Sequence, residues 1–253
     1  MAEWGARLRP WAVPLLLLGA LEIYARTVAA GSDAIAPPSA ALRAWFGALL
    51  DGSLWQATLF TMGSAALGLL IAALLGVAGG LLLGLSRRAD ASSLLTIELL
   101  RPIPSVALIP LAMLVFGFGL RMETAVIAFA AFWPMLILTR SAVRQVEPRL
   151  LEVSRVLGLS AWQRGIKIVL PACVPRLFVA LRLGVAIALV VAVTVEIAAN
   201  PHGMGYAMMV AQQSLDPALM LAWLGWIGVV GYVINALALR LQQRVARAMG
   251  EVA

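Results

Sequence analysis

The feature that most constrains this chain is a series of six apolar blocks, each long enough to cross a membrane as a helix. A bilayer core needs roughly 20 apolar residues in helical form. The blocks cover about residues 11–30, 59–85, 94–118, 124–139, 177–199 and 218–239. Apolar residues make up 62% of the chain and charged residues only 12%, which is more apolar surface than a soluble core could bury. We therefore predict an all-α integral membrane protein with six transmembrane helices.

The basic residues between the blocks predict the orientation of these helices, because lysine and arginine favour the cytoplasmic side. Most of them fall in alternate gaps and at the two ends of the chain: Arg7, Arg9, Arg87, Arg88, Arg140, Arg144, Arg149, Arg155, Arg164, Lys167, Arg176, Arg240, Arg244 and Arg247. The other gaps hold only Arg43 and Arg121. Six helices with both termini in the cytoplasm satisfy this distribution.

The first block has two interpretations. Arg7 and Arg9, the apolar run and the small residues at 28–30 together resemble a cleaved signal peptide. Glu22 and Arg26, however, lie late in the run and one helical turn apart, where they can pair. This favours a first helix that is retained in the membrane.

A short helix is predicted between the first and second blocks. Ser39 follows two prolines and is a suitable helix N-cap. Apolar residues then recur at helical spacing, at Leu42, Trp45, Phe46 and Leu49. We expect this helix to lie at the outer membrane interface.

Prolines interrupt the third block, at Pro102, Pro104 and Pro110. Each one removes a backbone donor, and an unpaired carbonyl is costly in lipid. The segment is therefore expected to be kinked and to face protein or a polar path.

Glycines line one face of the second block, at Gly76, Gly80 and Gly84. Missing side chains at this spacing let another helix approach closely. Tight packing within one subunit is favoured over a seam between two copies. The sixth block has a similar row with the same two interpretations, at Gly225, Gly228 and Gly231.

The loop from Ser141 to Pro175 is predicted to form two short amphipathic helices. Pro148 suits a first helical position, and Gly158 suits the left-handed residue that ends a helix. Ser160 and Gln163 form a capping box for the second helix, which Pro171 is expected to limit. The first helix is expected to offer an apolar face to a partner, formed by Leu150, Val153, Val156 and Leu157. The alternative is a solvated ion-pair face in which Glu152 bridges Arg149 and Arg155.

Three signatures resemble those of ABC importer permeases. Glu152-Val153-Ser154, Gly158, Ile168 and Leu170-Pro171 match the Glu-Ala-Ala loop in spacing and identity, except that Val153 and Ser154 replace the two alanines. The segment from residue 100 to 117 and Glu196 followed by residues 203–206 are similar to the sulfonate, nitrate, taurine and bicarbonate permeases. The resemblance covers about residues 37–247.

The resemblance implies a type I importer permease with a MetI-like bundle in a bacterial inner membrane. Residues 1–53 would hold the first span and the interfacial helix, and residues 54–247 the permease core with the coupling loop 141–175. In that family two permease subunits pair, two ATPase subunits bind below them, and a separate binding protein delivers a small solute. Expected solutes are sulfonate, taurine, nitrate or bicarbonate, with a vitamin precursor or an aromatic acid as alternatives.

The same resemblance carries roles onto the loop. Glu152 and Gly158 would be the docking and turn residues, and the end of the loop would tie it to the fifth helix. The residues expected to couple this chain to the ATPase are Glu152, Arg155, Gly158, Ile168, Leu170 and Pro171.

Polar groups inside the membrane are candidates for the solute path. Glu196 near the outer end of the fifth block is expected either to gate the path or to cap a loop amide. Glycines beside it would allow a tight re-entrant turn, and arginines could supply the positive potential that an anion needs. The predicted path residues are Arg101, Thr194, Glu196, Gly203 and Gly205, with Thr58, Thr61, Ser64 and Arg182 as further candidates.

No catalytic set appears in the sequence, so a non-catalytic transport subunit is expected. The sequence has no phosphate-binding loop ending in Gly-Lys-Ser or Gly-Lys-Thr, so ATP and Mg²⁺ are expected on the partner ATPase and no cofactor on this chain. His202 is the only histidine and cannot form a metal site alone. No nucleic-acid partner is expected, because the arginines lie between apolar blocks. A secondary transporter or a membrane anchor is the alternative, although internal repeats typical of the former are not evident.

Overall fold

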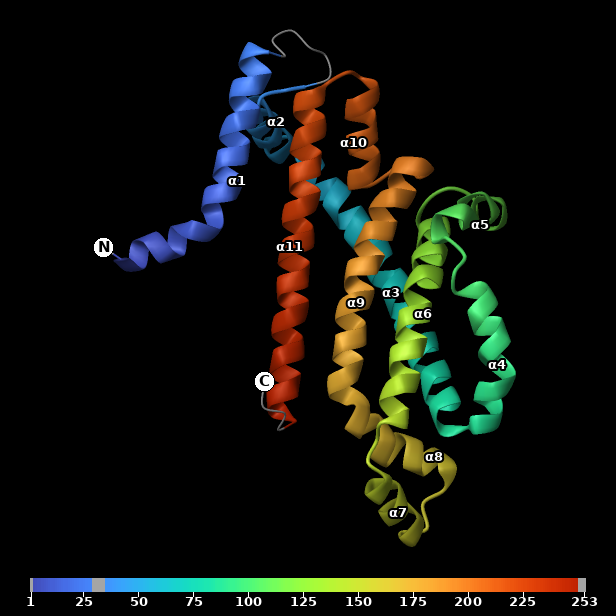
Figure 1. The fold of residues 1–253 in the computed structure, drawn as a ribbon. Helices are drawn as coiled ribbons and strands as arrows, with labels where there is room; N and C mark the ends of the chain where they lie inside the picture. Colours follow the sequence, from blue (N-terminus) through green and yellow to red (C-terminus); the bar gives the residue numbers. More distant parts are fainter. Residues whose placement is uncertain (1, 29–34, 250–253) are drawn as a thin grey trace.

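The computed structural model describes residues 2–28 and 35–249 of the chain. These residues form a bundle of helices, and no strand occurs among them (Figure 1). The all-α prediction is therefore confirmed.

Within the described part of the chain, four helices are long and apolar enough to cross a membrane. They are α3 (Ser53–Leu85), α6 (Leu120–Arg144), α9 (Leu170–Ala198) together with the turns that lead into it, and α11 (Pro217–Ala248). A fifth span results if the bent segment from Arg87 to Phe116 is counted as one. The helix α1 (Ala2–Thr27) forms in the predicted first block but is not among these spans. Its prolines and the Glu22–Arg26 pair make it less apolar than the others, and six spans remain a prediction.

The centre of the bundle is the contact between α3 and α6, with α9 packed against both. Glycines on α3 make the contact close, because a Cβ added at Gly76 would lie 2.6 Å from the Met135 Cβ, and one at Gly80 would overlap Thr139. The α3 glycines therefore pack within the subunit, as favoured from the sequence. On α11, Gly225 and Gly228 have nothing within 4 Å of such a Cβ among the described residues. Only Gly231 of that row has a close neighbour, because an added Cβ would lie 3.3 Å from Leu189 of α9.

The third block is broken into two helices instead of being kinked within one. The helix α4 (Arg87–Leu100) begins earlier than the predicted residue 94 and ends before Pro102. The chain then forms η1 (Ser105–Leu108) and α5 (Ile109–Phe116), which lie at 84° to α4. Pro102 and Pro104 fall in the break, where their missing N–H groups leave no gap in a helical ladder.

The predicted interfacial helix forms as α2 (Pro38–Leu50) and packs mainly against α11. The Trp45 and Trp226 rings are 5.7 Å apart, whereas Leu42 and Phe46 are exposed. The prediction that Ser39 caps this helix was wrong, because Pro37 occupies the N-cap. The Ser39 N–H instead donates to Glu22 Oε2 of α1 (3.0 Å), and Glu22 also pairs with Arg26 as expected.

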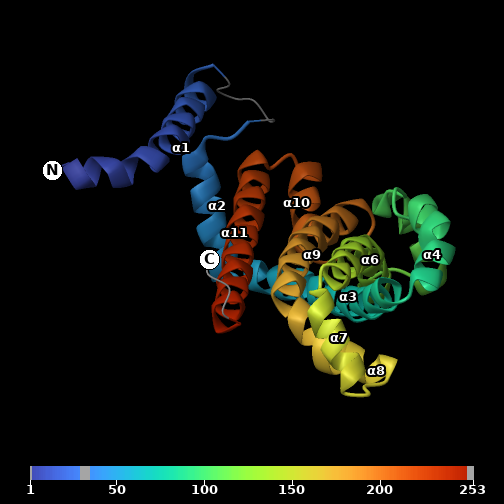
Figure 2. The same ribbon diagram turned by 60° about the horizontal axis from the view of Figure 1, so that its bottom comes forward.

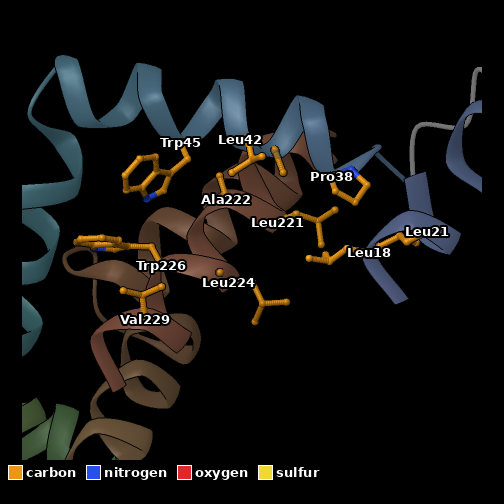
Figure 3. Close-up of a pocket in the computed structure, with 12 residues that line it drawn as sticks. Leu18, Leu21, Pro38, Leu42, Trp45, Leu221, Ala222, Leu224, Trp226 and Val229 are labelled. Carbon is orange, nitrogen blue, oxygen red and sulfur yellow. The ribbon is translucent and has the colours of Figure 1, made fainter. Parts of the chain in front are cut away.

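An apolar groove separates α1 from the α2–α11 pair (Figure 3). Its volume is about 520 Å³. Leu18 and Leu21 of α1 face Leu42 and Trp45 of α2 and Leu224 of α11 across it. Such a lining suits a surface in contact with lipid chains.

Candidate functional site

Five polar side chains lie buried together at the end of the bundle opposite to the 141–175 loop. Thr61 and Ser64 come from α3, Glu123 from the first turn of α6, Glu196 from the last turn of α9, and Asn200 from the segment that follows α9. Each is at most 1% exposed. We call these five residues the buried polar cluster.

Glu123 links three parts of the bundle within this cluster. Its Oε1 is hydrogen-bonded to the Ser64 hydroxyl, and its Oε2 accepts a hydrogen bond from the Asn200 side-chain amide. Glu123 is shielded from water, since its side chain is fully buried. Buried apolar residues of α5, α6 and α9 form a core cluster, among them Ala112, Val126 and Val195. Hydrogen bonds in such surroundings are stronger than in water, so the contact holds these helix ends together.

Glu196 caps the start of α10 (Met204–Gln213). Its Oε2 accepts the Gly205 N–H (2.8 Å), and Thr61 Oγ1 accepts the Met204 N–H (3.0 Å). Both amides belong to the first turn of a helix, whose donors lack intrahelical partners. Of the two roles expected for Glu196, the geometry is that of a cap, although the capped amide lies in the first turn of α10 and not in a loop.

The two glycines beside Glu196 serve different purposes. Gly203 has φ +94°, and a Cβ there would overlap the Glu196 carboxyl group, so both the turn and the contact require glycine. Gly205 lies inside α10, and its φ is not positive, so the expectation that it shapes the turn was wrong. Its missing side chain instead admits the Glu196 Cβ, which would lie 2.9 Å from an added Cβ.

The remaining predicted path residues lie outside the cluster. Thr194 is half-buried and donates its hydroxyl hydrogen to the Val190 carbonyl of its own helix (2.7 Å). Arg101 is exposed where α4 ends. Arg182 donates to Asn235 Oδ1 (3.2 Å), and Thr58 accepts from Trp226 Nε1 (2.8 Å), so both join α11 to its neighbours.

The sequence analysis missed Glu123 and Asn200. Glu123 stands directly before the predicted fourth block and looked like part of the preceding loop. The structure places it inside the first turn of α6, fully buried. An acidic residue so close to an apolar block was the one available signal, since intramembrane acids are functional candidates.

A cavity of about 440 Å³ borders the cluster. Glu196 and Asn200 line it together with Phe118, Tyr206 and Met209. A small molecule could therefore come close to the cluster from this side of the bundle.

The 141–175 loop contains the two predicted helices, joined by the predicted glycine turn. The helix α7 (Pro148–Val156) is followed by Gly158, whose φ of +67° is the left-handed conformation expected there. The Ser160 N–H donates to Gln163 Oε1 (3.0 Å), and the Gln163 N–H donates to Ser160 Oγ (3.2 Å). This reciprocal capping box starts α8 (Ala161–Arg164).

The second loop helix does not end at Pro171, contrary to expectation. It passes through the π-helical turn η2 (Gly165–Val169) into α9, so that Trp162–Ala198 forms one helix of 37 residues. The Leu170 N–H bonds to the Gly165 carbonyl, five residues back. Such a π turn adjusts the backbone just before Pro171, which cannot donate a hydrogen bond. Ile168 lies in this turn and is half-buried, and Leu170 and Pro171 begin α9.

The apolar face of α7 is turned outward, as expected of a surface that meets a partner. Val153, Val156 and Leu157 are 53%, 87% and 64% exposed, and Trp162 is 77% exposed. We call these four residues the exposed loop surface. Glu152 is exposed beside them.

The opposite side of the loop packs on the bundle. Leu151 contacts a buried cluster formed by Val143, Val146, Val169 and Cys173. Cys173 is a free and fully buried thiol within this cluster. The loop is therefore anchored to the ends of both α6 and α9.

Charged residues border the loop at the same end of the bundle. Asp90 of α4 forms ion pairs with Arg140 and Arg144 of α6. A cavity of about 700 Å³ lies beside these pairs and is lined by Arg87, Asp90, Arg144 and Arg164. In the part of the chain that the structure describes, no three histidine, cysteine or acidic side chains gather as a metal site would require.

Comparisons with known proteins agree with the resemblance of the three signatures. The model of the family "Binding-protein-dependent transport system inner membrane component" matches residues 68–251. The putative aliphatic sulfonates transport permease protein SsuC of Bacillus subtilis is 32% identical over 79% of this chain and 72% of its own length. The bicarbonate transport system permease protein CmpB of Synechococcus elongatus is 33% identical over 80% and 73%.

Another relative covers nearly the whole chain. The riboflavin transport system permease protein RibX of Chloroflexus aurantiacus is 31% identical over 97% of this chain and 91% of its own length. Among solved structures, the inward-facing MetNI methionine ABC transporter has a TM-score of 0.66. It is 18% identical over 73% of this chain and 92% of that chain, so it supports the fold alone.

Proposed function

Since the chain belongs to the binding-protein-dependent transport system inner membrane components, the permease subunits of ABC importers, we propose that it forms the path for a small anion across a bacterial inner membrane. It is a multi-pass membrane protein and not an enzyme, and ATP is hydrolysed by a partner ATPase. The finer proposal is six spans with both termini in the cytoplasm, two copies of the chain paired with two ATPase subunits, and a substrate-binding protein outside.

One observation carries the proposed mechanism, namely the unbroken helix Trp162–Ala198. It begins in the exposed loop surface and ends in the buried polar cluster, where Glu196 lies in its last turn. A rigid helix moves as a unit, so a displacement of the loop by a partner would reach the opposite end of the bundle. ATP-driven closure of the ATPase would thus change the balance between the inward-open and outward-open states of the path.

The exposed loop surface supports contact with the ATPase. Val156 and Trp162 are more exposed than large apolar side chains usually are, and they lie next to the turn at Gly158. Interface hot spots are commonly aromatic or apolar side chains that enter a pocket on the partner. We propose that these side chains and Glu152 enter a groove of the ATPase.

The proposed solute is a small organic or inorganic anion such as a sulfonate, taurine, nitrate or bicarbonate. The relatives named for sulfonate and bicarbonate transport support this class, whereas the relative named for riboflavin transport supports a vitamin precursor as the alternative. Uptake of labelled solutes by cells that express the full set of subunits would separate the two. Sulfonate uptake that is lost with the permease supports the proposal, and riboflavin uptake alone would contradict it.

The test of coupling is co-expression with candidate ATPase subunits, followed by pull-down and ATPase measurement. Gly158→Pro cannot adopt φ +67°, so it should abolish stimulated hydrolysis, and Glu152→Ala should weaken it. Gly158→Asn is the matched control, because asparagine tolerates the left-handed conformation. An ATPase that never binds, or one indifferent to Gly158→Pro, would contradict the proposal and favour a secondary transporter or an anchor.

A further inference from the structure

Two carboxyl groups, from Glu123 and Glu196, lie in the same buried polar cluster with no positive charge beside them. Among the described residues, the only ion pairs are Glu22–Arg26 and those that Asp90 makes with two arginines. The helices α3, α5 and α10 contain no charged residue. Arg121 of α6 and His202 of the α9–α10 segment are exposed, and Tyr206 of α10 is half-buried in the adjoining cavity. Two ionised carboxylates at this place would therefore be uncompensated.

The hydrogen bonds of the cluster also contain too few protons for two carboxylates. Ser64 Oγ lies within hydrogen-bonding distance of both Glu123 Oε1 and the Thr61 carbonyl (2.9 Å), yet a serine hydroxyl has only one hydrogen to donate. If that hydrogen goes to the carbonyl, Glu123 must be the donor to Ser64. The Thr61 hydroxyl is similarly occupied, since it donates to the Ala57 carbonyl (3.1 Å) and accepts from the Met204 N–H (3.0 Å).

Two further oxygens of the cluster have no donor at all. Glu196 Oε1 and Asn200 Oδ1 are buried and make no hydrogen bond. Both belong to side chains that are at most 1% exposed. A buried polar atom without a partner is costly, and a buried ionised carboxylate is costlier, so such groups are usually neutralised by a proton.

We propose that Glu123 and Glu196 together form a proton-binding site, in which the pair holds one proton and carries a single negative charge. The neutral carboxyl supplies the missing donor. The charged one keeps its own donors, which are Ser64 and Asn200 for Glu123 and the Gly205 N–H for Glu196. This proposal goes beyond the transport function. It does not depend on which solute the protein carries.

The proton has a structural consequence for this end of the bundle. The cluster joins the start of α6 and the end of α9 to α3 and α10. With the proton bound, these helix ends are held together by hydrogen bonds. When the proton is lost as the pH rises, two negative charges face each other in apolar surroundings, and the contact weakens. Stability of this end should therefore decrease as the pH rises.

The direct test is the infrared spectrum of the purified full-length protein at neutral pH, in the region of the carboxylic-acid C=O stretch. The wild type should show a protonated carboxyl band that is lost in Glu196→Gln or in Glu123→Gln. Glu98→Gln is the control, because Glu98 is exposed on α4 and lies outside the buried polar cluster. A wild type without such a band, or a band that survives both substitutions, would overturn the proposal.

A melting series keeps the proposal testable if a glutamine variant folds poorly. The melting temperature of the wild type should decrease as the pH rises, and a variant that folds should lose most of this dependence, since glutamine supplies a permanent donor. A melting temperature that is independent of pH, or one that follows sodium or potassium concentration instead, would overturn the proposal. The latter result would mean that both carboxylates are ionised around a bound cation.

Discussion

The buried polar cluster and the 141–175 loop are opposite in nearly every physical respect, although one helix connects them. The cluster places polar side chains in an apolar interior and closes them with hydrogen bonds. The loop places apolar side chains on the surface and leaves them uncovered. Its helices α7 and α8 project from the rest of the bundle (Figure 2). Polar groups are buried only when they are paired, and large apolar groups are exposed mainly where something else will cover them.

The contrast shows at which end of the molecule the side chains are paired and covered within the chain, and at which end they are not. The cluster end is satisfied by contacts within the chain, apart from the proton that we infer. The loop end leaves large apolar side chains exposed, which fits the proposed contact with the ATPase. Substitutions at the cluster should therefore change the stability of this chain, and substitutions on the exposed loop surface should change binding alone.

The largest effect is expected for Gly203→Ala. The φ of +94° strains any side chain, and the new Cβ would overlap the Glu196 carboxyl. Backbone strain and overpacking together should lower the free energy of unfolding by about 3 kcal/mol. Thermal melting in detergent measures the change. Gly228→Ala is the control, because a Cβ there meets nothing within 4 Å. Equal melting temperatures for the two variants would contradict the close contact between Gly203 and Glu196 on which the stability of the cluster end depends.

A smaller effect, on binding alone, is expected for Val156→Asp. This side chain is 87% exposed, so the charge should leave the melting temperature unchanged. Loss of one hot spot should weaken ATPase binding by about 2 kcal/mol, or about 30-fold. The affinity of the purified subunits measures this. Leu215→Asp, at an exposed position between α10 and α11, should bind normally. A lower melting temperature with unchanged affinity would contradict the assignment of Val156 to the interface.

The smallest effect is expected for Asp90→Asn, which sharpens the comparison at the loop end. The substitution removes ion pairs with Arg140 and Arg144, whose side chains are 21% and 43% exposed. Solvent weakens such pairs, so the loss should be about 1 kcal/mol and should decrease in high salt. Hydrogen exchange along α4 measures where the loss occurs. Glu98→Gln on the same helix should change nothing, and equal effects of both would show that the pairs contribute no stability.

The parts of the fold that were predictable from the sequence depend on neighbouring residues. Gly158, Ser160 and Gln163 specify a turn and a cap within a few positions, and the structure contains both. Prolines predicted an irregular third span for the same reason. The 84° bend itself depends on how α5 packs over α6, which no local pattern contains.

The parts that were not predictable depend on contacts between distant segments. Glu123 meets Ser64 and Asn200, which lie far from it in sequence, and its burial becomes apparent only when α3, α6 and α9 are assembled. Pro171 was expected to end a helix, as proline usually does, but a π turn carried the helix past it. Val169 and Cys173, on either side of Pro171, belong to one buried cluster with Val143 of α6, which the local sequence does not reveal.

The central claim is that the helix Trp162–Ala198 connects the loop to the opposite end of the bundle. The most direct test places spin labels at Leu120 and Leu215, two exposed positions at the cluster end, after Cys173 is replaced by alanine. The distance between the labels should change when the bound ATPase takes up ATP, and Gly158→Pro should abolish the change. A distance that does not respond to ATP, or that responds equally in Gly158→Pro, would contradict the account.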